Sequence, residues 1–354
     1  MYQKRLQKIT ALMENENIFQ MLLTSSSNLF YLTGVSFDSG ERFTALLLSR
    51  EQAPLFFCNS LFPQGEKSPF DVVWHEDGSD PLVSVIEKLN PQYPLAVDKD
   101  CPARFLFSLL KQSFHLSDAS SVIDRARMIK DTHEIRLLRE ASGINDKALH
   151  FLTEQFRPDI TEKELMRALE LFYNRHDSVF SFTPLIAFGS HAAFPHHETG
   201  NTLPETAGSV LFDIGGRTRG YCSDMTRTFS FGAPAPLLKE IHAITLEANT
   251  VAEEMIRPGV LFRDIDLTAR NIIEKYGYGE YFTHRTGHNI GIDVHEYPDV
   301  SRTNAMPVEA GMAFSVEPGI YIPGQCGVRI EDLVIVTETG VEILNKYPKD
   351  LKEL

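Results

Sequence analysis

The sequence predicts an α/β protein of two domains, on three observations. The 354 residues are enough for two hydrophobic cores, and the content of 43% hydrophobic and 23% charged residues is ordinary for a globular protein. Roughly the first 120 residues alternate strand-like runs with helical segments, which indicates a mixed α/β domain. From residue 131 longer amphipathic helices alternate with strand-like sequence. We expect an N-terminal domain over residues 1–125 and a second domain over residues 126–354.

In the first domain, Leu6, Ile9 and Met13 recur at helical spacing and predict a helix over residues 3–17. Short apolar runs bounded by polar residues predict strands, and longer periodic runs predict further helices. The strands are expected at 19–23, 45–48, 54–58, 72–74 and 94–97, and the helices near 81–89 and 103–112. The polar stretch Ser117-Asp-Ala-Ser-Ser121 is expected to be the linker between the domains.

In the second domain, two helices are predicted by their start signals. Asp131 is followed three residues later by Glu134, and Thr161 by Glu164, and both pairs have the pattern of a capping box. Apolar stripes predict two more helices, over residues 236–256 and 262–276. The sequence between the helix pairs reads as strands.

Composition excludes several classes of protein. The formal charge of −14 disfavours nucleic acid as a partner, because phosphate binding needs concentrated Lys and Arg. No apolar run approaches the roughly 20 residues of a membrane span, and Glu14 and Glu16 interrupt the start of the chain before a signal-peptide core. The four cysteines form no CxxC pair, which argues against a disulfide scaffold and a thiolate zinc site. We expect a cytoplasmic protein.

The stretch Phe282–Asp332 has the features of half a metal site. Three of the twelve histidines of the chain fall within twelve residues there, namely His284, His288 and His295. Glu317 and Glu331 follow, each within an apolar run that otherwise reads as a buried strand. Since burying an ionised carboxylate without a partner is costly, such residues usually face a cation.

Asp213 and Asp224 are the candidates for the other half. Asp213 closes an apolar run and Asp224 interrupts a β-rich one; taken singly, either could cap a turn or face solvent. With His288, Glu317 and Glu331 they offer four carboxylates and one imidazole, which suits Mn²⁺, Co²⁺ or Fe²⁺ better than structural zinc. Two divalent cations would balance the four charges, and two metals about 3.5–4 Å apart are typical of metal-assisted hydrolysis.

These segments resemble the pita-bread metallopeptidases that cleave before proline, Xaa-Pro dipeptidase (prolidase) and aminopeptidase P. Five motifs occur in the order of that family: Phe-Asp213-Ile-Gly-Gly, Ser-Asp224-Met-Thr-Arg-Thr, Thr-Gly-His288-Asn-Ile-Gly, Glu317-Pro-Gly-Ile-Tyr and Gly-Val-Arg329-Ile-Glu331-Asp. Asn28-Leu-Phe-Tyr-Leu-Thr-Gly34 extends the likeness into the first domain. The resemblance implies a creatinase/prolidase-like N-terminal domain and a pita-bread domain, a curved, mostly antiparallel sheet backed by four helices. It also implies a homodimer and an Xaa-Pro dipeptide or short peptide as substrate.

The resemblance also implies roles for the ligands. Asp213 would hold one metal, His288 and Glu317 would lie toward the other, and Asp224 and Glu331 would bridge the two. The two ions would be Mn²⁺ or Co²⁺, with Fe²⁺ or Zn²⁺ as alternatives. Glu317 or a bridging carboxylate would take the proton of the attacking water.

Four further residues receive roles from the resemblance. His196 matches a histidine that contacts substrate near the scissile bond, and His284 and His295 match two that orient substrate and stabilise the oxyanion; surface or core histidines are the alternative. Arg329 is expected to hold a ligand carboxylate in place, the alternative being an exposed strand arginine. His197 has no counterpart and is expected to be structural.

Three departures from the family pattern bear on the substrate. Asn289 and His197 stand where glycine is usual, and Asp299 stands where dipeptidases often have an arginine for the substrate carboxylate, with Arg302 the nearest candidate. Aminopeptidase P on longer peptides therefore stays open beside prolidase. A metal-free binding protein and creatinase-type hydrolysis are disfavoured because all five ligands are present, and methionine aminopeptidase because it normally lacks the first domain.

Overall fold

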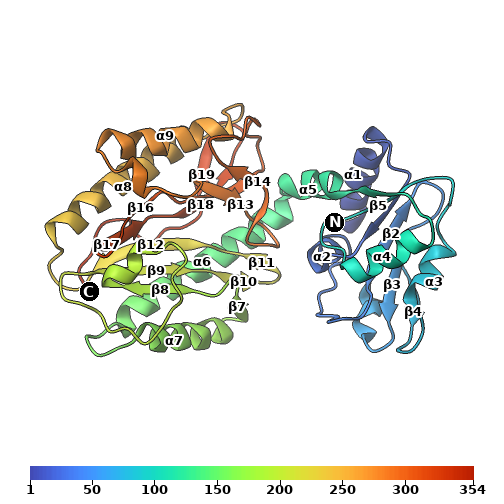
Figure 1. The fold of residues 1–354 in the computed structure, drawn as a ribbon, viewed down its shortest axis with the longest axis horizontal. Coiled ribbons are helices and arrows are strands. Elements are labelled where there is room, and N and C mark those ends of the chain that lie inside the picture. Colours follow the sequence, from blue (N-terminus) through green and yellow to red (C-terminus); the bar gives the residue numbers. More distant parts are fainter. The chain divides into compact units, whose positions relative to one another are not determined.

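The computed structural model describes the whole chain, residues 1–354. The chain forms two compact units, Met1–Arg127 and Met128–Leu354, here named the N-terminal and the C-terminal unit. Figure 1 shows the elements of both. Each unit has its own sheets and its own buried apolar clusters, which is the structural criterion for a domain. None of the helices is both long and apolar enough to cross a membrane.

The N-terminal unit is built on one sheet of six strands. They are β1 (Gln20–Leu23), β2 (Ala45–Ser49), β3 (Leu55–Asn59), β4 (Asp71–His75), β5 (Leu95–Val97) and β6 (Leu116–Asp118). The order across the sheet is β4-β3-β2-β1-β5-β6. Pairs β1/β2 and β2/β3 are antiparallel, whereas β1/β5, β3/β4 and β5/β6 are parallel. The five runs predicted as strands thus lie in one mixed sheet.

Five α-helices and one 3₁₀ helix belong to or border this sheet. They are α1 (Tyr2–Asn15), α2 (Ser26–Thr33), η1 (Pro63–Lys67), α3 (Pro81–Ile86), α4 (Ala103–Lys111) and α5 (Ser120–Met128). Gly34 ends α2 in the left-handed conformation, φ 71°, which glycine adopts at little cost.

The prediction of a linker at residues 117–121 is wrong. Ser117 and Asp118 belong to β6, which pairs in parallel with β5, and α5 begins at Ser120. Both residues are exposed because β6 is an edge strand, so their polarity reflects the sheet edge and not a break in the fold.

The C-terminal unit contains thirteen strands. They are β7 (Ser178–Phe180), β8 (Leu185–Phe188), β9 (Ser209–Ile214), β10 (Gly216–Thr218), β11 (Tyr221–Cys222), β12 (Met225–Ser230), β13 (Gly287–Asn289), β14 (Glu296–Val300), β15 (Ala313–Val316), β16 (Gly319–Ile322), β17 (Cys326–Arg329), β18 (Asp332–Val336) and β19 (Val341–Ile343). They form four sheets, ordered β11-β10-β7, β12-β9-β8, β14-β13-β15-β18-β19 and β16-β17. All pairings within these sheets are antiparallel.

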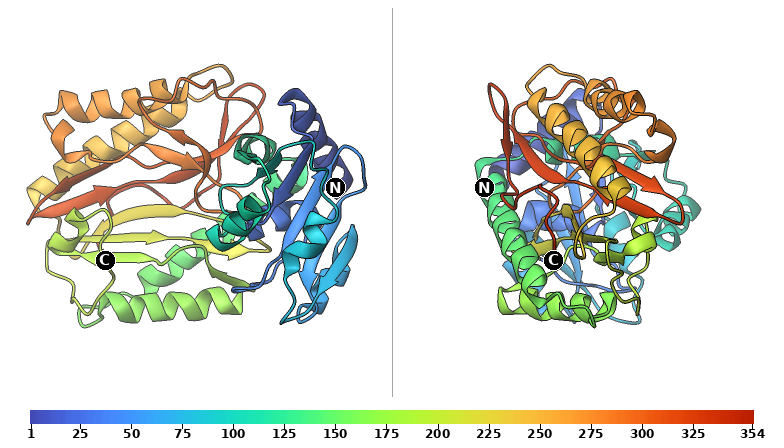
Figure 2. Two further views of the ribbon diagram at one scale, coloured as in Figure 1. Left: turned by 45° about the vertical axis from the view of Figure 1, so that its right-hand side comes forward. Right: turned by 90° about the vertical axis from the view of Figure 1, so that its left-hand side faces the viewer.

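Two pairs of helices cover these sheets from opposite sides, as Figures 1 and 2 show. They are α6 (Thr132–Gln155) with α7 (Glu162–Arg175), and α8 (Pro236–Glu254) with α9 (Phe262–Lys275); two 3₁₀ helices, η2 (Gly189–Ala193) and η3 (Gly279–Tyr281), lie in connecting segments. One apolar cluster joins α6 and α7 to β8, β9 and β12. A second joins α8 and α9 to β14–β18. The polar residues between the two clusters are therefore held by rigid packing on both sides.

Both predicted capping boxes are present. The carboxylate of Asp131 accepts hydrogen bonds from the amides of His133 and Glu134, and Glu134 in turn accepts from the amide of Asp131. Thr161 and Glu164 make the same reciprocal bonds at the start of α7. These bonds satisfy amides that a helix start otherwise leaves free.

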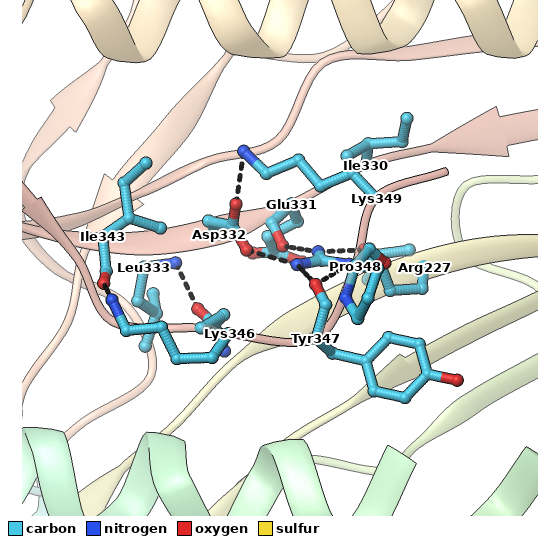
Figure 3. A network of polar contacts seen from close by, with 12 residues as sticks. Arg227, Ile330, Glu331, Asp332, Leu333, Ile343, Lys346, Tyr347, Pro348 and Lys349 are labelled. Carbon is cyan, nitrogen blue, oxygen red and sulfur yellow. Dashed lines mark hydrogen bonds and ion pairs between the residues drawn. The ribbon is translucent and has the colours of Figure 1, made fainter. Parts of the chain in front are cut away.

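A buried ionic network ties β12 to β18 and to the C-terminal segment (Figure 3). Arg227 Nη2 donates to Asp332 Oδ1 at 2.6 Å, and Lys349 Nζ lies 2.5 Å from Asp332 Oδ2. Lys349 also donates to Glu253 Oε2 at 2.6 Å. Two carboxylates thus meet two cations, and we name these four residues the balanced cluster.

Candidate metal centre

All nine residues predicted for the site line one cavity of about 1080 Å³ in the C-terminal unit. Its wall combines the five candidate ligands with three of the predicted histidines and one arginine. These residues are Asp213, Asp224, His288, Glu317, Glu331, His196, His284, His295 and Arg329. Residues from five separated sequence segments therefore share one solvent-connected space.

The register of β9 and β12 positions the two aspartates. Asp213 of β9 lies directly opposite Thr226 of β12, and directly opposed residues project from the same face of a sheet. Asp224 lies immediately before β12 and lines the same cavity as Asp213. Asp224 is buried, with 6% of its surface exposed. Two neighbouring strands thus bring two carboxylates to one place.

His288 stands in β13 with its ring aimed at the carboxylates. Nδ1 lies 3.2 Å from the carbonyl of Asn289, and because a carbonyl only accepts, Nδ1 carries the proton. The lone pair of Nε2 then faces Asp224 Oδ2 at 3.7 Å and Glu317 Oε1 at 3.4 Å. Burial, and next the neighbouring His295, lower the pKa of His288 to about 3. The neutral imidazole is in the form that binds metal.

Glu331 lies between β17 and β18 and is held by a hydroxyl rather than a cation. Thr226 Oγ1 donates to Glu331 Oε2 at 2.7 Å. Arg329, two residues earlier and so on the same face, donates from Nη2 to Asp213 Oδ2 and from Nε to Thr226 Oγ1 at 3.0 Å. Arg329 thus orients Asp213 directly and Glu331 through Thr226, the orienting role predicted for it.

The site carries more negative than positive charge. The four candidate carboxylates and the guanidinium of Arg329 together have a formal charge of −3, and the further lining residues Glu198 and Arg285 cancel each other. Burial raises the pKa of Asp224 well above its ordinary value, and the adjacent charge of Glu331 raises it further. Burial and then Glu317 raise the pKa of Glu331 likewise, and burial raises the pKa of Glu317 to about 7. Without further cations the site resists ionisation of its own acids.

The residues present fit divalent metal ions. Asp213 Oδ1 and Glu331 Oε1 are buried and have no hydrogen-bond partner, although buried carboxylate oxygens are normally paired. Ligand atoms of Asp224, His288 and Glu331 all lie within 4.8 Å of one another. Unpaired oxygens, a converging imidazole nitrogen and a charge deficit are together the properties of an oxygen-rich metal site.

Tyr321 is a site residue that sequence reasoning missed. Its hydroxyl accepts a hydrogen bond from Arg329 Nη1 at 2.9 Å, so its own proton points to His284 Nε2 at 2.8 Å. Burial raises the pKa of Tyr321 to about 12, which keeps that proton in place. The tyrosine lies within the Glu317-Pro-Gly-Ile-Tyr motif, but only the pairing of β16 with β17 shows that it meets Arg329.

The three predicted substrate histidines are placed differently. His284 has both nitrogens engaged, Nδ1 with the carbonyl of Arg285 at 2.7 Å and Nε2 with Tyr321. His295 packs edge-on against His288 with ring centroids 4.2 Å apart. His196 is exposed at the rim of the cavity. His295 and His196 are therefore open to a ligand, whereas His284 must exchange a bond to reach one.

Fold and site together define a metal-dependent hydrolase of two domains. The comparison with known families agrees: residues 136–338 match metallopeptidase family M24, and residues 5–129 match the creatinase/prolidase N-terminal domain. The chain belongs to metallopeptidase family M24. The expected fold, a creatinase/prolidase-like α/β domain followed by a pita-bread domain, is confirmed.

Known relatives share the full length of the chain. An uncharacterised peptidase of Staphylococcus aureus is 37% identical over 352 residues, covering 98% of this chain and 99% of the relative. The solved structure of a prolidase from Thermococcus sibiricus is 33% identical, with a TM-score of 0.95 and coverage of 100% and 99% of the two chains. The solved structure of an Xaa-Pro dipeptidase from Bacillus anthracis is 32% identical, with a TM-score of 0.93 and coverage of 100% of both chains.

Proposed function

We propose that this peptidase hydrolyses the bond between an N-terminal residue and proline, as a prolidase-like Xaa-Pro dipeptidase with two divalent metal ions. The observation that carries the proposal is the convergence of four carboxylates and one neutral imidazole on one cavity, where only the guanidinium of Arg329 forms an ion pair with one of these carboxylates. The names of the similar solved structures, prolidase and Xaa-Pro dipeptidase, support the choice of substrate.

Asp213, Asp224, His288, Glu317 and Glu331 would hold the ions, with Mn²⁺ or Co²⁺ favoured by the oxygen-rich set. Bound divalent ions supply an activated water and polarise the scissile carbonyl. Asp224 and Glu331 lie closest to a shared position, since both contribute to the same group of ligand atoms with His288. We assign the bridging role to these two carboxylates.

The remaining residues would orient the substrate and move protons. Glu317 Oε1 accepts from Ser315 Oγ at 3.1 Å and its carboxylate lines the cavity, so we assign it the proton of the attacking water. His295 and His196 present their rings to the cavity and would contact the substrate near the scissile bond. The proton chain from Arg329 through Tyr321 to His284 would fix the ring of His284 for stabilising the developing oxyanion.

The cation available to a dipeptide carboxylate is Arg285. Its side chain lines the cavity and is 40% exposed, with Asp299 Oδ2 at 3.9 Å as an ion-pair partner. Arg302 instead lines a neighbouring cavity of about 470 Å³, which shares His284 and Arg285 with the first. A free carboxylate would therefore meet Arg285 first. Aminopeptidase P activity on longer peptides is the alternative, because Asp299 weakens the positive potential at this end.

The test is hydrolysis of an Xaa-Pro dipeptide beside an Xaa-Pro-Yaa tripeptide, after chelation and then addition of Mn²⁺. Cleavage of the dipeptide, with KM raised in Arg285→Ala, supports the prolidase proposal. Cleavage of the tripeptide alone assigns aminopeptidase P activity. If neither peptide is cut although two ions bind, the proposed preference for proline is wrong. The homodimer implied by the sequence resemblance remains a prediction for solution measurements.

A further inference from the structure

A second group of metal-ligating side chains lies outside the nine-residue site. Glu162, the first residue of α7, is fully buried and directs its carboxylate at two histidines. His191 Nδ1 of η2 lies 3.3 Å from Glu162 Oε1, and His197 Nε2 lies 3.0 Å from Glu162 Oε2. The three ligand atoms fall within 4.8 Å of one another.

Backbone amides already satisfy the carboxylate of Glu162. The amide of Phe188 donates to Oε1 at 3.0 Å, and the amide of Gly200 donates to Oε2 at 2.8 Å. These bonds compensate the burial of the charge and fix the carboxylate in place. The two imidazoles are therefore not required to pair the carboxylate. Both nevertheless lie within hydrogen-bonding distance of its oxygens, with their ring centroids 4.5 Å apart.

The separations suit a metal ion. In a tetrahedral site with bonds of roughly 2.0–2.1 Å, neighbouring ligand atoms lie about 3.3 Å apart. Here His191 Nδ1 lies 3.3 Å from Glu162 Oε1 and His197 Nε2 lies 3.0 Å from Glu162 Oε2, so each histidine approaches its own oxygen of the carboxylate. Two histidines and one glutamate form the ligand set of zinc sites that keep an open coordination position. Thr202 Oγ1, 3.1 Å from His191 Nδ1, is a further oxygen beside the group.

We propose that Glu162, His191 and His197 bind one divalent ion of borderline hardness, with Zn²⁺ as the best-suited ion. The site shares no ligand with the proposed peptidase centre, although His197 lines the same cavity. Its amide contacts, Phe188 and Gly200, lie at the two ends of the segment that carries His196. A bound ion would therefore join the start of α7 to this segment and hold His196 at the rim of the cavity.

The experiment weakens the peptidase centre by removing two of its five proposed ligands, Asp224 and Glu331. Chelator-treated Asp224→Ala/Glu331→Ala protein is titrated with Zn²⁺ by calorimetry and with Co²⁺ by visible absorption. We expect one tight equivalent of Zn²⁺ and the visible bands of histidine-bound Co²⁺. Adding His191→Ala and His197→Ala should abolish both signals. His150→Ala is the control, because His150 also faces a glutamate, Glu154 at 3.4 Å, but both side chains are exposed.

Two results would overturn the proposal. One is no tight Zn²⁺ equivalent in the Asp224→Ala/Glu331→Ala protein, whose fold is checked by circular dichroism. The other is an equivalent that persists when both histidines are replaced. The single variant His191→Ala, at a partly exposed position, should fold and bind Zn²⁺ at least 10-fold more weakly, as loss of one of three ligands exceeds the roughly 10–100-fold effect of an outer partner. Failure of the peptidase centre would show separately, as an unchanged metal content on losing Asp224 and Glu331.

Discussion

Glu331 and Asp332 are neighbours in the chain, yet the balance of charges around their two side chains differs. Glu331 faces the cavity, where it is held by the hydroxyl of Thr226 and has one oxygen unpaired. Asp332 faces the other way and is bound by Arg227 and Lys349 (Figure 3). Strand alternation produces the contrast, since Thr226 and Arg227 are also neighbours that point to opposite faces. Around Glu331 carboxylates outnumber cations, whereas around Asp332 the numbers of carboxylates and cations are equal.

The contrast separates the buried carboxylates that we propose as metal ligands from those that already have cations of the chain as partners. The balanced cluster sets two carboxylates against two cations, so its formal charge is zero. The proposed peptidase site sets four carboxylates against Arg329, so added divalent ions would balance its excess of negative charge. Burial alone does not distinguish them, as Glu331 and Asp332 are exposed by only 2% and 0%. The excess of carboxylates over cations, and not burial, distinguishes the proposed metal site from the balanced cluster.

The largest expected effect comes from removing a proposed metal ligand of the peptidase site, where carboxylates outnumber cations. Asp224→Ala or Glu331→Ala should abolish peptidase activity and binding of two ions, a loss beyond the roughly 10–100-fold typical of outer partners. Steady-state kinetics and metal analysis measure it, with the exposed Glu338→Ala as control. Full turnover in either variant would contradict the assignment.

In the balanced cluster, removal of a carboxylate should lower the stability of the fold instead. Asp332→Asn leaves the buried Arg227 without its carboxylate partner, while the partly exposed Lys349 keeps Glu253. This should lower the free energy of unfolding by about 3–5 kcal/mol. Denaturant unfolding measures the loss. The surface pair Arg139–Glu342, at 2.6 Å and partly exposed, supplies the control, and Glu342→Gln should cost at most about 1 kcal/mol. Equal costs in the two variants would remove the basis of the contrast.

His242 tests whether the surroundings of the balanced cluster accept a further positive charge, that of a protonated histidine. It is buried in α8 with Nε2 unpaired, and burial lowers its pKa from 6.5 to about 4, the charge of Arg227 adding to the effect of burial while Asp350 opposes both. The unfolded chain therefore binds the proton more tightly, and stability should fall as the pH drops from 6.5 toward 4. Between pH 7 and 5 the loss should be about 2 kcal/mol. His242→Gln should lose less stability over this range in denaturant unfolding, and an identical pH profile would contradict the prediction.

The smallest expected effect is a gain in the free energy of unfolding instead of a loss. In metal-free protein at neutral pH, Glu331→Gln should raise the free energy of unfolding by about 1 kcal/mol, because it relieves repulsion that no cation offsets. The gain should vanish when Mn²⁺ is added to both proteins, since the wild type then gains the free energy of binding. A lower stability of the metal-free variant would show that Glu331 is already compensated.

The sequence was sufficient for much of this account. Capping boxes predict α6 and α7 because the capping pattern is local in sequence. The carboxylates within apolar strands could be identified as candidate ligands because burying a carboxylate without a partner is energetically costly. Tyr321 and Thr226 could not be recognised, since their roles depend on which strands pair and in which register. The polar edge strand β6 was mistaken for a linker, because an exposed edge has the composition of a loop. The convergence of Glu162 with His191 and His197 depends on the path of a connecting segment that no periodicity encodes.

The most direct test of the central claim is a Mn²⁺ titration of chelator-treated wild-type protein, followed by calorimetry and by thermal unfolding. The charge deficit predicts two bound equivalents and a rise in unfolding temperature, and Asp332→Asn, below its own unfolding temperature, should still bind two. Absence of binding, or binding without any gain in stability, would contradict the claim that the unmatched carboxylates form a two-metal site.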